Sequence, residues 1–227
     1  MTQFLRTAQM RRRVLMTLFG VCGCAIAVGM LTHATLGLDP FSVLMRGIWR
    51  HTRLSYGTYY TLVNALMLAG VFLVDRKKIG LGTLINLFLL GYIVDFSTWA
   101  CALLFPDPSL PVRVALLLLG LLLVCITSAL YYTGDLGVST YDAIALTLGE
   151  RTRVPFQVWR VTTDVSCVLL GGALCYLSDH SLAPGGALLV TVGVGTLVVA
   201  FFMGPFVAFF NRTLAIPLRY GKRPEKA

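Results

Sequence analysis

The sequence predicts an all-α polytopic membrane protein. Its six transmembrane helices would form two inverted three-helix repeats, each with a short broken or re-entrant helix after its first span. Three observations predict this fold. The chain has 227 residues, of which 57% are hydrophobic and only 13% charged, whereas a soluble domain carries roughly a quarter charged residues. Six apolar runs are long enough to cross a bilayer, at roughly 20 residues per crossing. Two polar stretches, one hundred residues apart, interrupt the apolar pattern in the same way.

The six apolar runs are separated by segments that cannot continue a membrane helix. The predicted spans are residues 14–36, 57–74, 79–105, 113–133, 155–177 and 185–210. The charged segment DRKK follows the second span, and the three prolines of PDPSLP follow the third and cannot sustain a helix. Arginines precede the first run as in a signal peptide, but no small-residue cleavage site follows a short apolar core, so a retained first helix is expected.

Basic residues predict the orientation of these spans, because Lys and Arg favour cytoplasmic loops. With the N-terminus inside, fourteen basic residues fall inside and four outside. We therefore expect a multi-pass protein of the cell membrane with both termini in the cytoplasm. The net charge of +9 then reflects orientation and not nucleic-acid binding, since no basic stripe is interleaved with aromatic residues. One loop disagrees, because Arg46, Arg50 and Arg53 would lie outside.

An internal repeat accounts for the two interruptions. A shift of one hundred residues aligns Arg13 with Arg113, Gly20 with Gly120, Gly37 with Gly137, Arg53 with Arg153, and Asn64 with Asp164. Further along, GLGT at 80–83 aligns with GVGT at 193–196 at an offset of 113. The first repeat would cover residues 1–106, and the second residues 107–227 with a basic cytoplasmic tail. Because three spans per copy is an odd number, the second copy enters the bilayer from the opposite side, which predicts a pseudo-two-fold axis in the membrane plane.

Each interruption combines a helix stop with a new helix start. Gly37 and Gly137 suit the left-handed conformation that often ends a helix. Asp39 in the first copy, and Ser139 or Thr140 in the second, could cap the helix that follows. That helix of about ten residues is too short to cross. It could lie flat at the interface, or it could dip into the protein and direct its N-terminal amides, which carry partial positive charge, at a cavity.

In order and duplication, these motifs resemble the YczE/YyaS/YitT-type bacterial integral membrane proteins, most closely the YczE-like branch. GVSTYD resembles the G-x-G-P-x-D element of that family and keeps its acid as Asp142. WRVTTD resembles its Arg-x-x-x-acid element, with Arg160 and Asp164. GLDPFS keeps Pro40 but has Ser42 where an acid is expected. The family is of poorly defined function, so the resemblance implies a bacterial inner-membrane architecture far more than an activity.

Arg160 and Asp164 are the leading candidates for a functional site. Asp164 lies on the order of 14 Å into the fifth span, where an isolated charge costs at least about 2.5–3.5 kcal/mol. A spacing of four places both side chains on one helix face, where they can pair. The pair could fix helix register or face a polar cavity. Asn64, its repeat-related neighbour in the second span, could approach the same midplane or make a simple helix contact.

The predicted substrate-binding set is Arg160, Asp164, Asn64, Asp142, Asp39, Arg53 and Arg153. Asp39 and Asp142 belong to the short helices and could instead act only as caps. No Cys or His has metal-ligand spacing, and no Ser–His–Asp or Cys–His set can be assembled. We therefore predict no enzyme activity, no metal and no cofactor.

The combination of an inverted repeat, broken helices and a charged pair at the midplane predicts a small secondary transporter or channel for a polar or anionic solute. Arg160 and the short-helix N-termini would bind the solute, and Asp164 would act as counter-ion or proton carrier. The expected partners are the lipid bilayer and this solute, with a homo-oligomer or a cytoplasmic protein as further possibilities. The alternative is a regulatory or substrate-capture membrane subunit of a larger complex that transports nothing itself.

Overall fold

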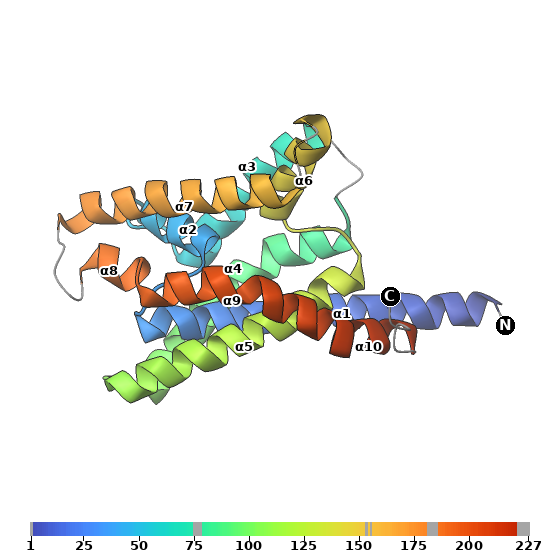
Figure 1. The fold of residues 1–227 in the computed structure, drawn as a ribbon, viewed down its shortest axis with the longest axis horizontal. Coiled ribbons are helices and arrows are strands. Elements are labelled where there is room, and N and C mark those ends of the chain that lie inside the picture. Colours follow the sequence, from blue (N-terminus) through green and yellow to red (C-terminus); the bar gives the residue numbers. More distant parts are fainter. Residues whose placement is uncertain (1, 75–78, 153, 155, 181–185, 222–227) are drawn as a thin grey trace.

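The protein is a bundle of helices (Figure 1). The computed structural model describes residues 2–74, 79–152, 154, 156–180 and 186–221, and this part of the chain contains no strand. Its helices are α1 (Thr2–Ala34), α2 (Pro40–Trp49), α3 (Tyr56–Val74), α4 (Leu81–Leu104), α5 (Leu110–Gly134), α6 (Thr140–Thr152), α7 (Phe156–Asp179), α8 (Ala187–Thr191), α9 (Val194–Phe210) and α10 (Ile216–Tyr220). A π-helical turn, Asn211–Ala215, joins the last two.

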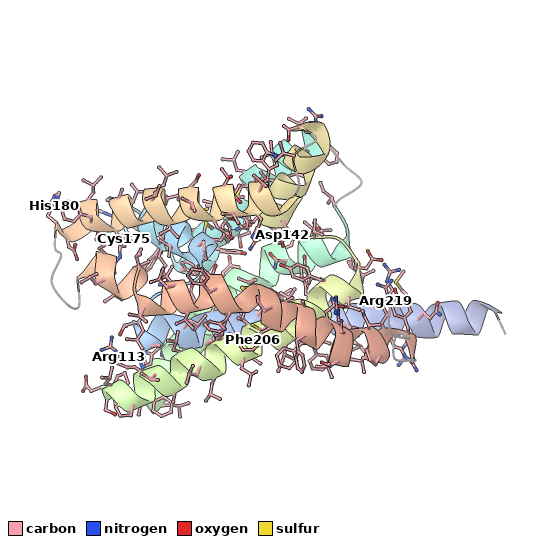
Figure 2. All side chains as sticks on the ribbon, in the orientation of Figure 1. Arg113, Asp142, Cys175, His180, Phe206 and Arg219 are labelled. Carbon is pink, nitrogen blue, oxygen red and sulfur yellow. The ribbon has the colours of Figure 1, made fainter. Side chains whose placement is uncertain are left out.

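Within the described residues, six helical stretches are long and apolar enough to cross a membrane. They are α1, α3, α4, α5, α7 and the stretch Ala187–Tyr220. Large apolar side chains cover their outer faces: Leu66, Leu73, Leu169 and Phe201 are each at least 67% exposed, and Figure 2 shows such side chains around the whole bundle. Lipid is the solvent that suits this surface, so the protein is a multi-pass membrane protein.

The second to fifth predicted spans agree with the helices to within a few residues, whereas α1 begins at Thr2, well before the predicted start at residue 14. A sixth apolar stretch is present over Ala187–Tyr220 where a span was predicted over residues 185–210, but its helix is interrupted. The chain forms α8, breaks at Val192 and Gly193, and resumes as α9. The helical path also continues past residue 210 to Tyr220. The break was missed because its partner is distant in sequence: the amide of Gly195 donates to the carbonyl oxygen of Leu36 at 2.7 Å.

Successive long helices along the chain run in opposite directions (Figure 1). In that view α1, α4 and α7 run away from the end where the N-terminus is marked, and α3, α5 and α9 run back towards it. The start of α1 and the end of α10 therefore lie at the same end of the bundle. At the centre α1 packs against α5, and these two helices are flanked by α4 and α9 respectively.

An arginine from each of α1 and α5 caps the C-terminal end of the other helix. Nε of Arg13 donates to the carbonyl oxygen of Gly134 at 3.0 Å. Nε of Arg113 donates to the carbonyl oxygen of Ala34 at 2.8 Å. Carbonyls in the last turn of a helix have no partner within the helix, and a cation there also meets the negative end of the helix dipole. The aligned pair Arg13 and Arg113 thus has the same structural role at opposite ends of the bundle.

The two polar interruptions form matching loops that dock on the GxGT segments. Gly37 and Gly137 have φ values of 115° and 111°, a region that favours glycine. The carbonyl oxygen of Leu136, beside Gly137, accepts from the amide of Gly82 at 2.7 Å, just as Leu36 accepts from Gly195. Each loop therefore binds the glycine-rich segment of the other half of the chain.

The structure gives a local role to Arg46, one of the three arginines that disagree with the charge bias. The guanidinium of Arg46 on α2 lies 4.4 Å from the ring centroid of Tyr56 and 5.2 Å from that of Trp49. It also donates to the hydroxyl of Thr32 at 3.3 Å. Stacking of a cation on aromatic rings is favourable and specific to this packing, so a local structural role accounts for Arg46 in this loop.

Candidate functional site

The two short helices begin side by side in the interior. The ring of Phe41 on α2 stacks on the ring of Tyr141 on α6, with centroids 4.7 Å apart and an interplanar angle of 23°. Asp39 caps α2, since its Oδ1 accepts from the amide of Ser42 at 3.1 Å. Ser139 caps α6, since its hydroxyl accepts from the amide of Asp142 at 3.1 Å. The stack thus places two capped helix N-termini next to each other.

Arg160 on α7 connects these helix starts to the fifth span. Its Nη1 forms an ion pair with Oδ1 of Asp142, and its Nε lies 3.3 Å from Oδ2 of Asp164. Its guanidinium also lies 4.7 Å from the centroid of the Tyr141 ring. Figure 2 shows Asp142 in the interior, between α7 and α9. The predicted pairing of Arg160 with Asp164 is present, and Asp142 is a second carboxylate that the helix spacing alone did not reveal.

Hydroxyl groups hold the two carboxylates in place. Tyr141 donates to Oδ1 of Asp164 at 2.6 Å. Ser139 and Tyr132 both donate to Oδ2 of Asp142, at 2.7 Å and 3.2 Å. A carboxylate can accept hydrogen bonds through both oxygens, so these donors fix the orientation of both acids.

The site contains more negative than positive charge. Three carboxylates, Asp39, Asp142 and Asp164, surround the single guanidinium of Arg160. Asp39 forms no ion pair with any described residue. Asp39 precedes α2 and lies outside the six spans, and burial raises its pKa, although hydrogen bonds from Ser42 lower it in part. With all four groups ionised, the site carries a net charge of −2, and Asp39 is the carboxylate without a charged partner.

Asn64 on α3 forms a hydrogen bond with the start of α6. Its side-chain amide nitrogen donates to the carbonyl oxygen of Tyr60 at 3.0 Å, and its Oδ1 accepts from the hydroxyl of Thr140. The residue is 1% exposed. Its contact is therefore with the N-terminus of α6, while Asp164, the residue one hundred positions further along the chain, contacts Tyr141, one residue after Thr140.

These polar groups line an inner cavity of about 120 Å³. Its walls include Asp39, Asn64, Asp142 and Arg160, together with the aromatic residues Phe41, Tyr56, Tyr60, Tyr131, Tyr132 and Tyr141. One water molecule occupies roughly 30 Å³ in the liquid, so the space suits a solute of a few non-hydrogen atoms.

A larger pocket of about 510 Å³ adjoins the inner cavity. The two spaces share Asp39, Tyr132, Asp142, Arg160, Val199 and Met203 as lining residues. Asp164 lines only the larger one. The ion pair of Arg160 and Asp142 therefore stands at the boundary between an inner chamber and an outer one.

The structure brings together most of the predicted site residues. Arg160, Asp164, Asp142 and Asp39 line the larger pocket, and Asn64 lines the inner cavity. Arg53 does not lie there: it is exposed in the loop between α2 and α3. Arg153 is outside the described residues.

Sequence reasoning missed the tyrosines of the site. Tyr131 and Tyr132 come from the end of α5, and Tyr141 from α6. The segment LYYTGDLGVSTYD places all three around the second polar interruption. Aromatic residues at the edges of that loop were the available signal, because a side chain that leaves a helix end at a break can point into the space the break creates.

Comparison with known proteins identifies a family and two relatives. The family DUF6198, described as a family of unknown function, matches residues 11–212. The chain is 29% identical over 198 residues to an uncharacterized protein of Haemophilus influenzae, covering 87% of this chain and 83% of that protein. It is 21% identical over 174 residues to the uncharacterized membrane protein YczE of Bacillus subtilis, covering 77% and 73%. No solved structure gives a significant match. The resemblance to the YczE-like proteins is thereby confirmed.

Proposed function

The chain belongs to the DUF6198 family, a family of unknown function, and from its site we propose that it is a small secondary transporter or channel that binds a polar solute between two inverted repeats. The observation that carries this proposal is the inner cavity at the starts of two broken helices, lined by Arg160 and by Asp142, with which Arg160 forms an ion pair. Charged groups inside a membrane bundle are expensive and usually mark an ion or solute pathway.

Reciprocal contacts support the inverted-repeat part of the proposal. Aligned residues make equivalent contacts across the two halves, as the caps formed by Arg13 and Arg113 and the loops at Gly37 and Gly137 illustrate. The corresponding helices also run in opposite directions: α1 against α5, α3 against α7, and α4 against α9 (Figure 1). In transporters built this way, the solute binds near the midplane where broken helices of the two repeats meet.

The distribution of basic residues supports an orientation with both chain ends in the cytoplasm. The end of the bundle that holds the start of α1 and the end of α10 also holds Arg11, Arg12, Arg13 and Arg219. Clustered arginines at one end of the spans favour the cytoplasmic side. The short helices α2 and α6 would then be re-entrant, because their first residues line the interior cavity.

The charge balance favours a solute that is not anionic. Arg160 already has two carboxylate partners, so a free anion would have to displace one of them. The sequence left polar and anionic solutes open. With a site charge of −2, we propose a neutral or cationic polar solute. Asp164, which lines the outer pocket, would then act as a counter-ion and change its pairing as the solute passes.

Solute flux in proteoliposomes tests the proposal. Radiolabelled glycine, methylammonium and phosphate serve as zwitterionic, cationic and anionic probes. The parent protein is expected to carry at least one of the first two. Asp164→Asn, which keeps an oxygen to accept from Tyr141 while removing the charge, should reduce that flux at least tenfold. Arg12→Ala, an exposed change far from the cavity, should leave it unchanged.

Two outcomes would overturn transport. One is absence of flux for all probes in liposomes that hold folded parent protein. The other is equal flux in the parent and in Asp164→Asn. A stoichiometric ATPase or enzyme that co-purifies with a flux-negative protein would instead support the alternative, a subunit of a larger membrane complex.

A further inference from the structure

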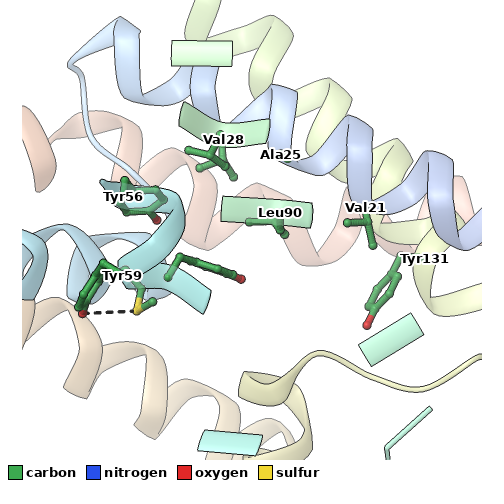
Figure 3. Close-up of a cluster of buried hydrophobic side chains, with 10 residues drawn as sticks. Val21, Ala25, Val28, Tyr56, Tyr59, Leu90 and Tyr131 are labelled. Carbon is green, nitrogen blue, oxygen red and sulfur yellow. Dashed lines mark hydrogen bonds between the residues drawn. The ribbon is translucent and has the colours of Figure 1, made fainter. Parts of the chain in front are cut away.

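One residue that lines the inner cavity carries a polar group with no hydrogen-bond partner in the described part of the chain. The hydroxyl of Tyr131 is buried and has no hydrogen-bond partner among the described residues. The side chain lines the inner cavity together with Asp39, and the residue is only 6% exposed. Figure 3 shows its ring extending away from Val21 on α1, with the hydroxyl at the far end.

An unpaired buried hydroxyl is unusual, because it loses water without gaining a partner. Phenylalanine would provide the same ring without that penalty. The same cavity also holds the amide side chain of Asn86, which is 7% exposed and likewise makes no hydrogen bond within the described chain. Tyr131 and Asn86 therefore offer acceptor oxygens to whatever enters the cavity.

The charge of the missing partner follows from Asp39. This carboxylate lines the inner cavity, and one of its oxygens caps α2. In the described part of the chain it has no cationic partner, although Arg160 nearby is shared by Asp142 and Asp164. A buried carboxylate is stabilised by a positive charge close to it. A cation in the cavity would supply that charge.

We propose that the inner cavity binds a small organic monocation that carries an ammonium group, with Asp39 as its counter-charge and the hydroxyl oxygen of Tyr131 as a hydrogen-bond acceptor. This deepens the proposed function by naming the class of solute at that site. Binding itself, however, does not depend on whether the protein transports the solute.

An ammonium group matches the walls better than a metal ion does. It offers only donors, and the cavity offers carboxylate, phenol and amide oxygens. The aromatic residues around it present π-faces and edges, and aromatic faces attract organic cations. Among the described residues, no group of three His, Cys, Asp or Glu side chains is arranged to hold a metal ion. The volume of about 120 Å³ accommodates a small alkylammonium.

Thermal unfolding of the purified protein in detergent tests this proposal, with methylammonium chloride as the probe and sodium chloride at equal ionic strength as the reference. A ligand that binds only the folded state raises the Tm with its concentration. For the parent, methylammonium should raise the Tm more than sodium does, with a saturable dose dependence.

Two variants separate binding from folding. Asp39→Asn removes the charge but keeps an oxygen that can accept from the amide of Ser42, so α2 stays capped. It should abolish the methylammonium response. Tyr131→Phe removes only the unpaired hydroxyl, so the protein should fold at least as stably as the parent. Its apparent affinity for methylammonium should fall about tenfold, the effect of one hydrogen bond to a charged group.

A matched control is Thr17→Val on α1. The hydroxyl of Thr17 is also buried and unpaired among the described residues, but it does not line the inner cavity. This variant should respond to methylammonium as the parent does. The proposal is overturned if sodium and methylammonium shift the parent equally, or if Asp39→Asn responds like the parent. If methylammonium binds saturably but no solute is transported, this inference stands and the transport proposal fails. If glycine is transported but methylammonium does not bind, the transport proposal stands and this inference fails.

Discussion

At the scale of single residues, Arg160 connects the charged groups in the interior of the bundle. It contacts carboxylates on two helices and lies over an aromatic ring, with only 27% of its side chain exposed. Buried ion pairs often add little net stability, but removing one partner leaves uncompensated charge. In this protein two acids, Asp142 and Asp164, would be left without their cation.

We therefore expect Arg160→Ala to destabilise the protein by about 3 kcal/mol. The measurement is denaturant unfolding in detergent, followed by tryptophan fluorescence. Arg160→Ala combined with Asp142→Asn and Asp164→Asn should recover much of the loss, because no unpaired charge remains at those two positions. If Arg160→Ala is as stable as the parent, the ion pairs of Arg160 do not contribute to the stability of the fold.

Asp39 gives the site a dependence on pH. Burial raises its pKa, and a protonated carboxyl no longer attracts a cation. The charged groups that face Asp39 are Arg160 and Asp164, both on α7. Two further titratable residues, Asp142 on α6 and Tyr132 on α5, line the same pocket. Methylammonium binding should therefore weaken as pH falls through the raised pKa of Asp39 and should be strongest above it.

Titrating the methylammonium-induced Tm shift from neutral pH down to acid pH measures this effect. The parent should lose the shift towards the acid end of the titration. Tyr131→Phe keeps the carboxylate, so it should show a smaller shift with the same pH midpoint. A shift that grows as the pH falls would have the wrong sign for a carboxylate counter-charge.

At the scale of elements, the fold depends on the two docked loops. Gly37 has a φ of 115°, and a Cβ at this position would lie 2.7 Å from the amide nitrogen of Thr196 and 2.8 Å from that of Gly193. Neither the conformation nor the backbone neighbours can accommodate a side chain without movement. The break in the sixth span and the start of α2 would both be disturbed.

Gly37→Ala is therefore expected to destabilise the protein by about 2 kcal/mol or more. Thermal unfolding in detergent provides the comparison. Gly70→Ala in α3 is the matched control, because nothing lies within 4 Å of the position that the added methyl group would occupy. That control should be neutral or slightly stabilising, since alanine favours a helix by about 1 kcal/mol over glycine.

The helices also show which structural features can be predicted from sequence patterns and which cannot. Hydrophobic run length located the six apolar spans of the described chain, and the glycine stops located both short helices, because these signals are local. The break at Gly193 is fixed by Leu36, which lies in the other half of the chain. The segment GVGT at 193–196 marks the position of the break, but apolar run length alone does not show that its partner is the loop at Leu36.

The same distinction holds within the site. Spacing along one helix predicted the pair Arg160 and Asp164, since four residues bring two side chains together. The ion pair with Asp142 and the hydrogen bond from Tyr141 join two different helices. Nothing in their sequence separation indicates these contacts, which arise only when α6 packs against α7.

At the scale of the whole molecule, the proposed topology can be tested by chemical labelling. The loop between α4 and α5 lies at the opposite end of the bundle from the start of α1 (Figure 1). In a variant lacking the six native cysteines, a cysteine introduced at Asp107 should react with a membrane-impermeant maleimide added to intact cells. A cysteine introduced at Arg12 should react only after the cells are opened, and the reverse pattern would invert the orientation.

The reciprocal loops carry a consequence for assembly. Because Leu36 needs the glycine segment of the second half and Leu136 needs that of the first, neither three-span piece can complete its own hydrogen bonding. A gene cut between residues 106 and 107 should therefore yield fragments that are degraded when made singly, yet form a stable pair when made together. Fusion of the two halves in one polypeptide then ensures equal amounts of two mutually dependent pieces.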